Sequence, residues 1–243
     1  MYNITLFDIS IAFIPVVITL VIVFYWSNGI KNAIIAILRM LIQLLLIGYA
    51  LDFIFNSSNH WIILAVLSFM LVAASWIALV PLPVKKSELL VYSLAAIAGG
   101  GIVNLVLITQ GVLHADPWYQ PAVLIPLGGM IFANAMNAVS LAGERLYSEL
   151  ENRPDYARAR NLAFQAAMIP TINSLLAVGL VSLPGMMTGQ ILAGTSPLIA
   201  VRYQIVVMCM VFSSAGISTA LFLWLIREAS QQHLDRQRAE SCG

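Results

Sequence analysis

The stretch FDISIAFIPVVITLVIVFYW, residues 7–26, decides the class of this chain. A helix needs roughly 20 mainly apolar residues to cross the hydrocarbon core of a bilayer, and this stretch has that length with one charge, Asp8. It lacks the basic region and small-residue cleavage site of a secretory signal, so we expect a retained first span. Six further apolar stretches lie at about residues 33–55, 61–80, 88–109, 120–141, 166–183 and 199–226, which predicts seven spans.

The composition agrees with a membrane environment. Of the 243 residues, 60% are hydrophobic and 9% are charged, whereas soluble domains carry about 25% charged residues. A net charge of +1 gives no basic field that would attract nucleic acid. No internal repeat or linker divides the sequence. We therefore expect an all-α, polytopic transmembrane helical bundle built as a single domain, residues 1–243.

The connections between the expected spans alternate in basic content. Those after the first, third and fifth spans and the C-terminal tail contain Lys or Arg, whereas residues 56–60, 110–119 and 184–197 contain none. Cytoplasmic loops carry the excess of Lys and Arg, so we predict an outer N-terminus and a cytoplasmic C-terminus. The residues that set this bias are Lys31, Lys85, Lys86, Arg145, Arg153, Arg158, Arg160, Arg227, Arg236 and Arg238.

Arg39 lies inside the second span, and Gln43 follows one turn later on the same face. Charged residues within a span are costly and usually face the bundle interior or a cavity. Two interpretations stay open. The arginine side chain reaches back to the cytoplasmic surface, or it takes part in gating or anchors a neighbouring helix.

The fifth expected span, PLGGMIFANAMNAVSLAGERL (126–146), carries a polar stripe. Asn134, Asn137 and Ser140 recur every three residues and share one helical face, which Glu144 continues toward the cytoplasm. Amides in lipid need partners, so this face is expected to point into the bundle. Its side chains would form hydrogen bonds to neighbouring helices, line a polar path for a substrate, or do both.

The connection after this span, about residues 142–166, is expected to be a long cytoplasmic loop. Asn152 suits a helix cap, Pro154 a first helical turn, and Asp155 the positive end of a helix. A short amphipathic helix is predicted from Ala157 to Ala167, with Arg158, Arg160 and Asn161 exposed. Such a helix lies on anionic lipid or docks a cytoplasmic partner, and the pattern does not separate the two.

The sixth span contains Asn173, and Pro170 and Pro184 are expected to interrupt helix at its two ends. The segment GMMTGQILAGTSP (185–197) is largely apolar and could be a re-entrant or interfacial segment at the outer mouth. Met186, Met187 and Gln190 make it a possible part of a substrate path, although methionine is more often packing.

Three kinds of site lack their sequence signatures. Residues 189–196 have the glycine spacing of a phosphate loop, but Thr195 replaces the lysine that reaches the phosphates, so no nucleotide site is predicted. No His/Cys/Asp/Glu cluster has metal-ligand spacing, and no residues form a catalytic acid/base pair or nucleophile triad. Metal-binding residues are therefore not assigned.

Three sets of residues carry a family resemblance. IPTINSLLAVGLVSLPGMMTGQILAGTSPLIAVRYQIV (169–206) resembles the signature of the FetB-like permeases, which are membrane subunits of ABC transporters. Residues 126–146, and Arg39 with Gln43 and Leu44, are similar to the same family. The resemblance implies a permease that pairs with a separate cytoplasmic ATPase as two plus two subunits, in which the cytoplasmic loop before the sixth span is the coupling element. Residues 150–155 of this loop, LENRPD, depart from the alanine- and glycine-containing segment of the family. We assign the coupling to its charged residues Glu151, Asp155, Arg158 and Arg160. The family is linked to iron export in bacteria, and to aluminium tolerance and a nucleotide sugar in plants.

Together these observations predict a multi-pass protein of the cell (inner) membrane. The family resemblance alone implies that it exports iron or another metal ion. The chain itself would bind no cofactor, and its partner would use ATP. The predicted substrate path comprises Asn134, Asn137, Ser140, Arg39, Gln43, Asn173, Met186, Met187 and Gln190. The alternatives are a permease for a nucleotide sugar or other small solute, and a self-contained channel or ion-coupled transporter. The last is disfavoured because the acids near the spans, Asp8, Asp52, Glu88 and Glu144, lie toward their ends.

Overall fold

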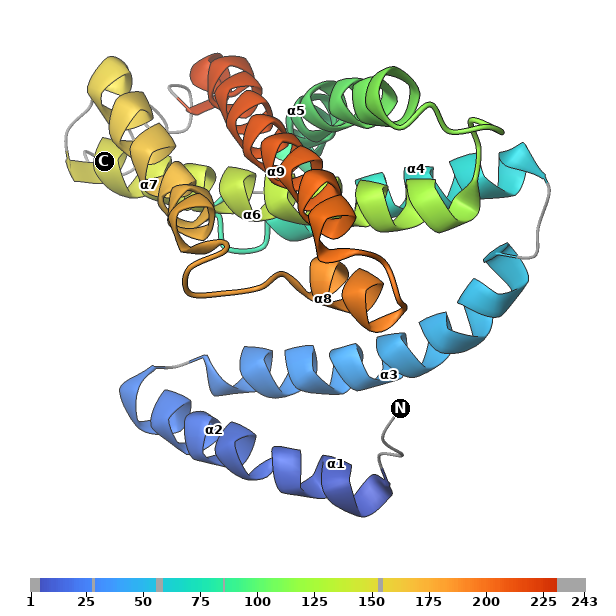
Figure 1. The fold of residues 1–243 in the computed structure, drawn as a ribbon. Helices are drawn as coiled ribbons and strands as arrows, with labels where there is room; N and C mark the ends of the chain where they lie inside the picture. Colours follow the sequence, from blue (N-terminus) through green and yellow to red (C-terminus); the bar gives the residue numbers. More distant parts are fainter. Residues whose placement is uncertain (1–4, 28, 56–58, 85, 153–154, 231–243) are drawn as a thin grey trace, which may run out of the picture. The chain divides into compact units, whose positions relative to one another are not determined.

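The computed structural model describes residues 5–27, 29–55, 59–84, 86–152 and 155–230 (Figure 1). These residues form helices and the turns between them, and no β-strand occurs among them. The elements are α1 (Leu6–Ala12), α2 (Ile14–Trp26), α3 (Ile30–Phe55), α4 (His60–Ala78), α5 (Lys86–Val106), the π-helix η1 (Leu107–Val112), α6 (Pro121–Asn152), α7 (Tyr156–Ala177), α8 (Gly185–Leu192) and α9 (Pro197–Leu225).

Six stretches of the described chain are long and apolar enough to cross a membrane, which confirms a multi-pass helical membrane protein. They are Phe7–Trp26, Ile30–Tyr49, His60–Ala78, Lys86–Val112, Pro121–Glu151 and Pro197–Leu225. The expected span at 166–183 is not among them. It falls on the second half of α7, whose first half carries Arg158, Arg160 and Gln165. The count of seven spans and the orientation therefore stay predictions.

The chain divides into two compact units, Met1–Ser57 and Ser58–Gly243. Whether they act as the single domain expected from the sequence stays a prediction. In the first unit, α1 begins at a capping box, where Thr5 Oγ1 accepts from the Asp8 backbone N–H at 3.3 Å. Helix α2 starts anew at Ile14 because Pro15 fits the first turn of a helix and not its interior. No side chain of α2 is buried, as expected for a surface that lipid or other protein covers.

In the second unit, α6 is the central helix and contacts α4, α5, α7 and α9. Its buried face carries alanines between larger side chains, and α7 presents an alanine every four residues. Small residues let helix backbones approach closely, which stabilises packing in lipid where apolar side chains gain little from leaving the solvent. The alanines are Ala135, Ala138 and Ala142 on α6 and Ala159, Ala163 and Ala167 on α7.

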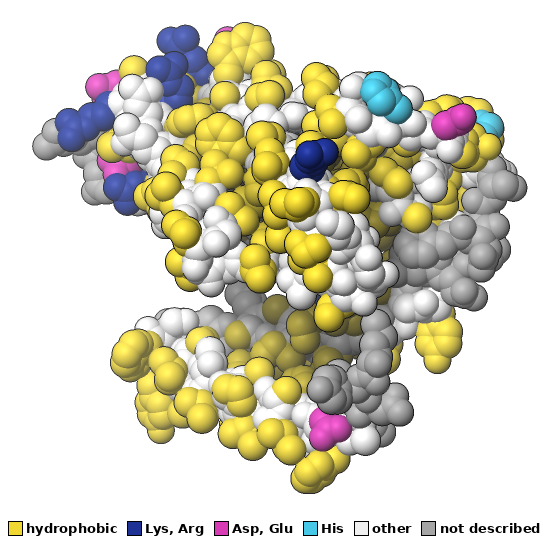
Figure 2. Space-filling view, viewed as in Figure 1, with side chains coloured by type: hydrophobic (Ala, Val, Ile, Leu, Met, Phe, Trp, Pro, Cys, Tyr) yellow, Lys and Arg dark blue, Asp and Glu magenta, His cyan; other side chains and the backbone are white. Residues whose placement is uncertain are grey.

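The two ends of this unit differ in chemistry. At one end His60 stacks near Trp61 and Tyr119, with ring centroids 5.0 and 5.8 Å apart, and Trp118 lies 5.6 Å from Tyr119. The cluster brings the start of α4 next to the segment that precedes α6. The connections leading into these two helices contain no Lys or Arg. Most of the Lys and Arg visible on the unit in Figure 2 gather at the opposite end. Such aromatic residues are enriched where a membrane meets water.

Several sequence expectations for the middle of the chain are wrong. The long loop at 142–166 is instead two helices, since α6 continues to Asn152 and α7 begins at Tyr156. Asp155, not Asn152, caps α7, and its Oδ1 accepts from the Arg158 backbone N–H at 3.2 Å. Pro154 and Arg153 lie outside the described residues, as do Lys85, Arg236 and Arg238.

Helix α7 also differs from expectation at its C-terminal half. The predicted short helix and sixth span are one continuous helix, with Pro170 inside it. Proline removes one backbone hydrogen bond, but Ala167, Met168 and Thr171 around it are buried, and this packing holds the helix together. The helix ends at Ala177, where Gly179 adopts φ +81°, and residues 185–192 form α8 rather than irregular backbone.

Candidate functional site

The polar stripe of α6 does not face the bundle of its own unit. Asn137 is exposed, and Asn134 and Ser140 flank it half-buried. Asn134 Nδ2 donates to the Met130 carbonyl of the same helix at 2.8 Å, so this donor is satisfied without a neighbouring helix. The expectation of an inward-facing stripe is wrong for this unit, because the alanine face of α6 occupies the interior. The stripe is an amide-bearing surface on an otherwise apolar helix.

Arg39 and Gln43 lie one turn apart on α3, and both are exposed. They belong to the first unit, and the stripe belongs to the second. The spacing of one turn places Arg39 and Gln43 on the same face of α3, as predicted. The role of this pair in a substrate path stays a prediction.

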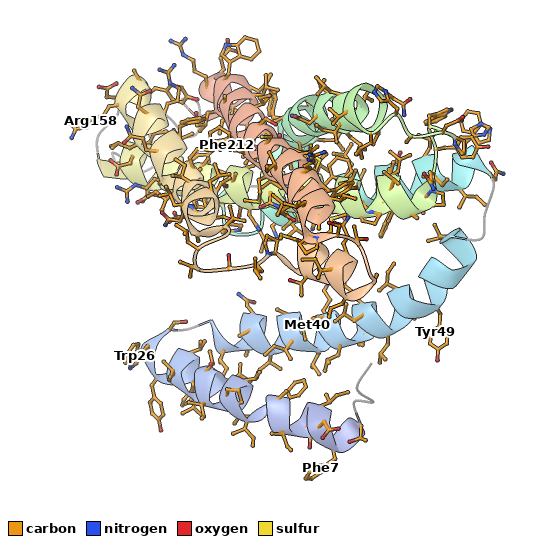
Figure 3. The ribbon with its side chains drawn as sticks, in the orientation of Figure 1. Phe7, Trp26, Met40, Tyr49, Arg158 and Phe212 are labelled. Atoms are coloured by element: carbon orange, nitrogen blue, oxygen red, sulfur yellow. The ribbon has the colours of Figure 1, made fainter. Side chains whose placement is uncertain are left out.

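The predicted coupling residues surround the turn between α6 and α7. Glu151, Asp155, Arg158 and Arg160 are all exposed within two turns of helix on either side. On α6, Arg145 Nη2 lies 2.5 Å from Glu149 Oε1, which pairs two of the charges that precede the turn. Arg158 points away from the bundle in Figure 3. The result is a charged helical hairpin at the basic end of the unit.

The start of α7 is tied to α9 at this end. The Tyr156 hydroxyl donates to the Leu223 carbonyl, a contact between residues 67 positions apart in sequence. Burial raises the pKa of Tyr156 to about 12, and the positive charges of Arg160 and Arg227 oppose that rise. Tyr156 thus fixes the first turn of α7 against the last turns of α9.

Helix α8 packs on α9 and carries three of the predicted path residues. Met186, Met187 and Gln190 are half-buried, and Gln190 Oε1 is buried without a hydrogen-bond partner. Asn173, by contrast, is exposed on α7. Residues 189–192 are helical, so they do not form a phosphate-binding loop. Among the described residues no group of three His, Cys, Asp or Glu side chains could hold a metal ion.

A polar seam between α5 and α9 was not predicted from the sequence. Ser213 Oγ donates to Asn104 Oδ1 at 2.6 Å, and Asn104 Nδ2 donates to the Gly100 carbonyl at 2.7 Å. Gln204, on the same helix α9, is 6% exposed, with a buried Oε1 that has no partner. The signal that could have revealed it is the small and polar run at 213–219 opposite the glycines at 99–101, because such residues mark close helix contacts in membranes.

Comparison with known proteins places this architecture in a family. The model of an uncharacterised protein family, UPF0014, matches residues 6–230. The chain belongs to the UPF0014 family. No solved structure matches this UPF0014 protein.

Three relatives of this UPF0014 protein cover nearly its full length. The "Probable iron export permease protein FetB" of Escherichia coli is 34% identical over 92% of this chain and 91% of its own. A UPF0014 membrane protein of Synechocystis sp. is 34% identical, covering 86% of this chain and 83% of its own. "Protein ALUMINUM SENSITIVE 3" of Arabidopsis thaliana is 32% identical, covering 86% and 82%. The resemblance to FetB-like permeases is confirmed.

Proposed function

We propose that this UPF0014 protein is the permease subunit of an ABC transporter that exports a metal ion, with iron the first candidate. ATP would be hydrolysed by a separate cytoplasmic ATPase, and two permeases would assemble with two ATPases. The observation that carries the proposal is the charged α6–α7 hairpin. A second support is the similarity to FetB, whose name describes iron export.

The hairpin would transmit a movement of the ATPase to the helices in the membrane. Glu151, Asp155 and Arg158 offer charges of both signs at its tip. From that tip α7 runs without interruption to Ala177 along the buried alanine face shared with α6. A displacement of the tip by an ATPase would therefore shift the packed helix, which is the shear type of conformational change.

The α6 stripe would form part of the substrate path once a second permease faces it. An amide such as that of Asn137 is costly to expose to lipid, so another chain or a water-filled path should cover it. Asn134, Asn137 and Ser140 offer amide and hydroxyl oxygens, and Met186 and Met187 offer thioether sulfurs. These are weak ligands for a metal ion, suited to a transporter that must release its substrate.

Reconstitution with the ATPase tests the coupling. The permease would be co-purified with ATPases encoded by the same organism, and ATPase stimulation would be screened against iron, other metals and nucleotide sugars. Arg158→Glu should weaken ATPase binding and stimulation. Arg202→Gln, an exposed arginine at the start of α9, is the matched control and should leave both unchanged. Transport that survives ATP depletion, with no ATPase ever co-purifying, would refute the ABC assignment.

A second set of variants tests the path. Asn137→Leu removes the exposed amide but keeps the branched shape and the number of heavy atoms of the side chain, and it should lower flux while the complex still assembles. Leu141→Ala, one turn further along the same exposed face, should leave flux near the wild-type value. Equal flux in the wild type and Asn137→Leu would mean that the stripe contributes to packing and not to the substrate path. The coupling proposal would be unaffected.

A further inference from the structure

A groove runs between α7 and α9 on the surface of the second unit. Two adjoining cavities of about 440 and 500 Å³ form it, and both are lined by Phe164 and Gln165. Each volume lies within the range of small-molecule sites, roughly 300–1,000 Å³. Figure 1 shows the two helices side by side with α6 beneath them.

The chemistry of the groove changes along its length. At the basic end the lining includes Arg160, Asn161 and Trp224. Further along it becomes almost entirely apolar, with Met168, Ile172, Phe212, Gly216 and Ile217. Phe212 is labelled on α9 in Figure 3. Arg160 is the one charged side chain among the described residues that line the two cavities. The groove therefore has a cationic, polar head and an apolar tail.

Its length fits one leaflet of a bilayer. From Arg160 to Ile172 on α7, and from Trp224 to Phe212 on α9, twelve residues at a rise of 1.5 Å span about 18 Å. Half of the hydrocarbon core of a bilayer is about 15 Å thick. Trp224 lines the polar end, and Tyr156 donates to the carbonyl of Leu223, which lines the same end. Trp and Tyr concentrate at the level of lipid headgroups.

The guanidinium group at the polar end retains donors for a ligand. Arg160 Nε and Nη2 donate to Asn161 Oδ1 at 3.3 and 3.0 Å, which orients the planar group. Arginine has five N–H donors and matches phosphate oxygens well. Arg227 acts on Tyr156 together with Arg160, so a second positive charge lies near this end.

We propose that the α7–α9 groove binds an anionic phospholipid, with its phosphate at Arg160 and an acyl chain along Phe164, Met168 and Phe212. The site does not depend on the transport function proposed above. It uses the opposite side of α7 from Arg158, because residues two apart in a helix point about 200° apart. A lipid seated there would brace α7 against α9 where Tyr156 already joins them.

Brominated lipids test the site in the intact chain. The protein would be placed in phosphatidylcholine nanodiscs containing a small fraction of phosphatidylglycerol or phosphatidylcholine with brominated acyl chains. Bromine quenches tryptophan fluorescence. The part of the quenching that depends on Trp224 is obtained by subtracting the quenching measured in Trp224→Phe from that measured in the wild type. We expect stronger quenching by brominated phosphatidylglycerol. Arg160→Gln should lower that preference about fivefold, the effect of one basic residue at a membrane surface, and Arg158→Gln should keep it.

A second variant tests the acyl-chain end. Gly216→Leu would fill the apolar cavity and should abolish the Trp224-dependent quenching by both lipids. Gly216→Ala is the control, since its Cβ would meet Met168 Cε at 3.7 Å, an ordinary contact. If Gly216→Leu does not fold, the comparison of Arg160→Gln with Arg158→Gln decides alone. Equal quenching by the two lipids in the wild type, or equal lipid preference in Arg160→Gln and Arg158→Gln, would overturn the proposal.

A second copy of the chain is the rival occupant. Ile217→Cys, in a background without the two native cysteines, should form no disulfide-linked dimer under oxidation if lipid fills the groove. A disulfide-linked dimer through this position would overturn the lipid assignment.

Discussion

Replacing Gly100 by alanine should force α5 and α9 apart. A Cβ at this position would lie 2.3 Å from Ser218 Oγ, 2.8 Å from the Ser218 backbone nitrogen and 3.1 Å from the Ser214 carbonyl oxygen. The hydroxyl can rotate away, but the other two atoms belong to the backbone of α9. Favourable contacts need about 3.5 Å or more, so the helices must separate by several tenths of an ångström.

The expected cost follows from that separation. Overpacking of a close-packed interior costs about 1–3 kcal/mol, and the better helix propensity of alanine offsets at most about 1 kcal/mol. Taking the middle of the overpacking range, about 2 kcal/mol, leaves a net loss of about 1–2 kcal/mol. This loss corresponds to a melting temperature lower by about 2–8 °C for a chain of this length. Tryptophan fluorescence of the purified protein in detergent measures it.

Two controls make the result decisive. Gly99→Ala changes the neighbouring glycine, whose Cβ would meet only Leu221 Cδ1 at 3.0 Å, the end of a flexible side chain. It should melt close to the wild type. Adding Ser218→Gly to Gly100→Ala should not restore stability, because the backbone contact remains. If Gly100→Ala melts like the wild type, the close approach of α5 and α9 is wrong.

Three further predictions concern the seam and the hairpin. Ser213→Ala should lower stability by about 0.6–2 kcal/mol, the range for hydrogen bonds between membrane helices, and a double-mutant cycle with Asn104→Ala should show coupling; additive losses would argue against the bond. Asp155→Ala should cost about 0.5–2 kcal/mol through loss of the helix cap, measured by chemical unfolding, with Asp155→Asn nearly neutral; equal losses in both variants would contradict a capping role. The raised pKa of Tyr156 means that the folded state holds this proton more tightly than the unfolded state. The contribution of Tyr156 to stability should therefore be constant below pH 10 and be lost as the pH rises from about 10 to 12, so the fall in stability over this range should be smaller in Tyr156→Phe; an unchanged slope would show that Tyr156 does not contribute.

Membrane-spanning helices could be predicted well because hydropathy is a local property. A run such as residues 7–26 is apolar whatever it packs against, and water cannot surround it in any fold. The family resemblance was available for the same reason, since it lies in the order of residues from Ile169 to Val206. The effect of a proline on where a helix ends was harder to predict from the sequence. Pro170 costs a hydrogen bond in any helix, and only the buried neighbours Ala167, Met168 and Thr171 explain why α7 continues through it.

The direction in which a helical face points depends on which neighbours pack best. Helical periodicity placed Asn134, Asn137 and Ser140 on one face, but the alanines of α6 take the interior because they allow α7 to approach closely. Packing between helices also brings Asn104 to Ser213, which are 109 positions apart in sequence, and forms the groove between α7 and α9. The sequence alone determined a multi-pass helical membrane protein and its family, since apolar length and residue order are local. Tertiary structure alone decided which polar groups are buried, because burial depends on contacts between distant segments.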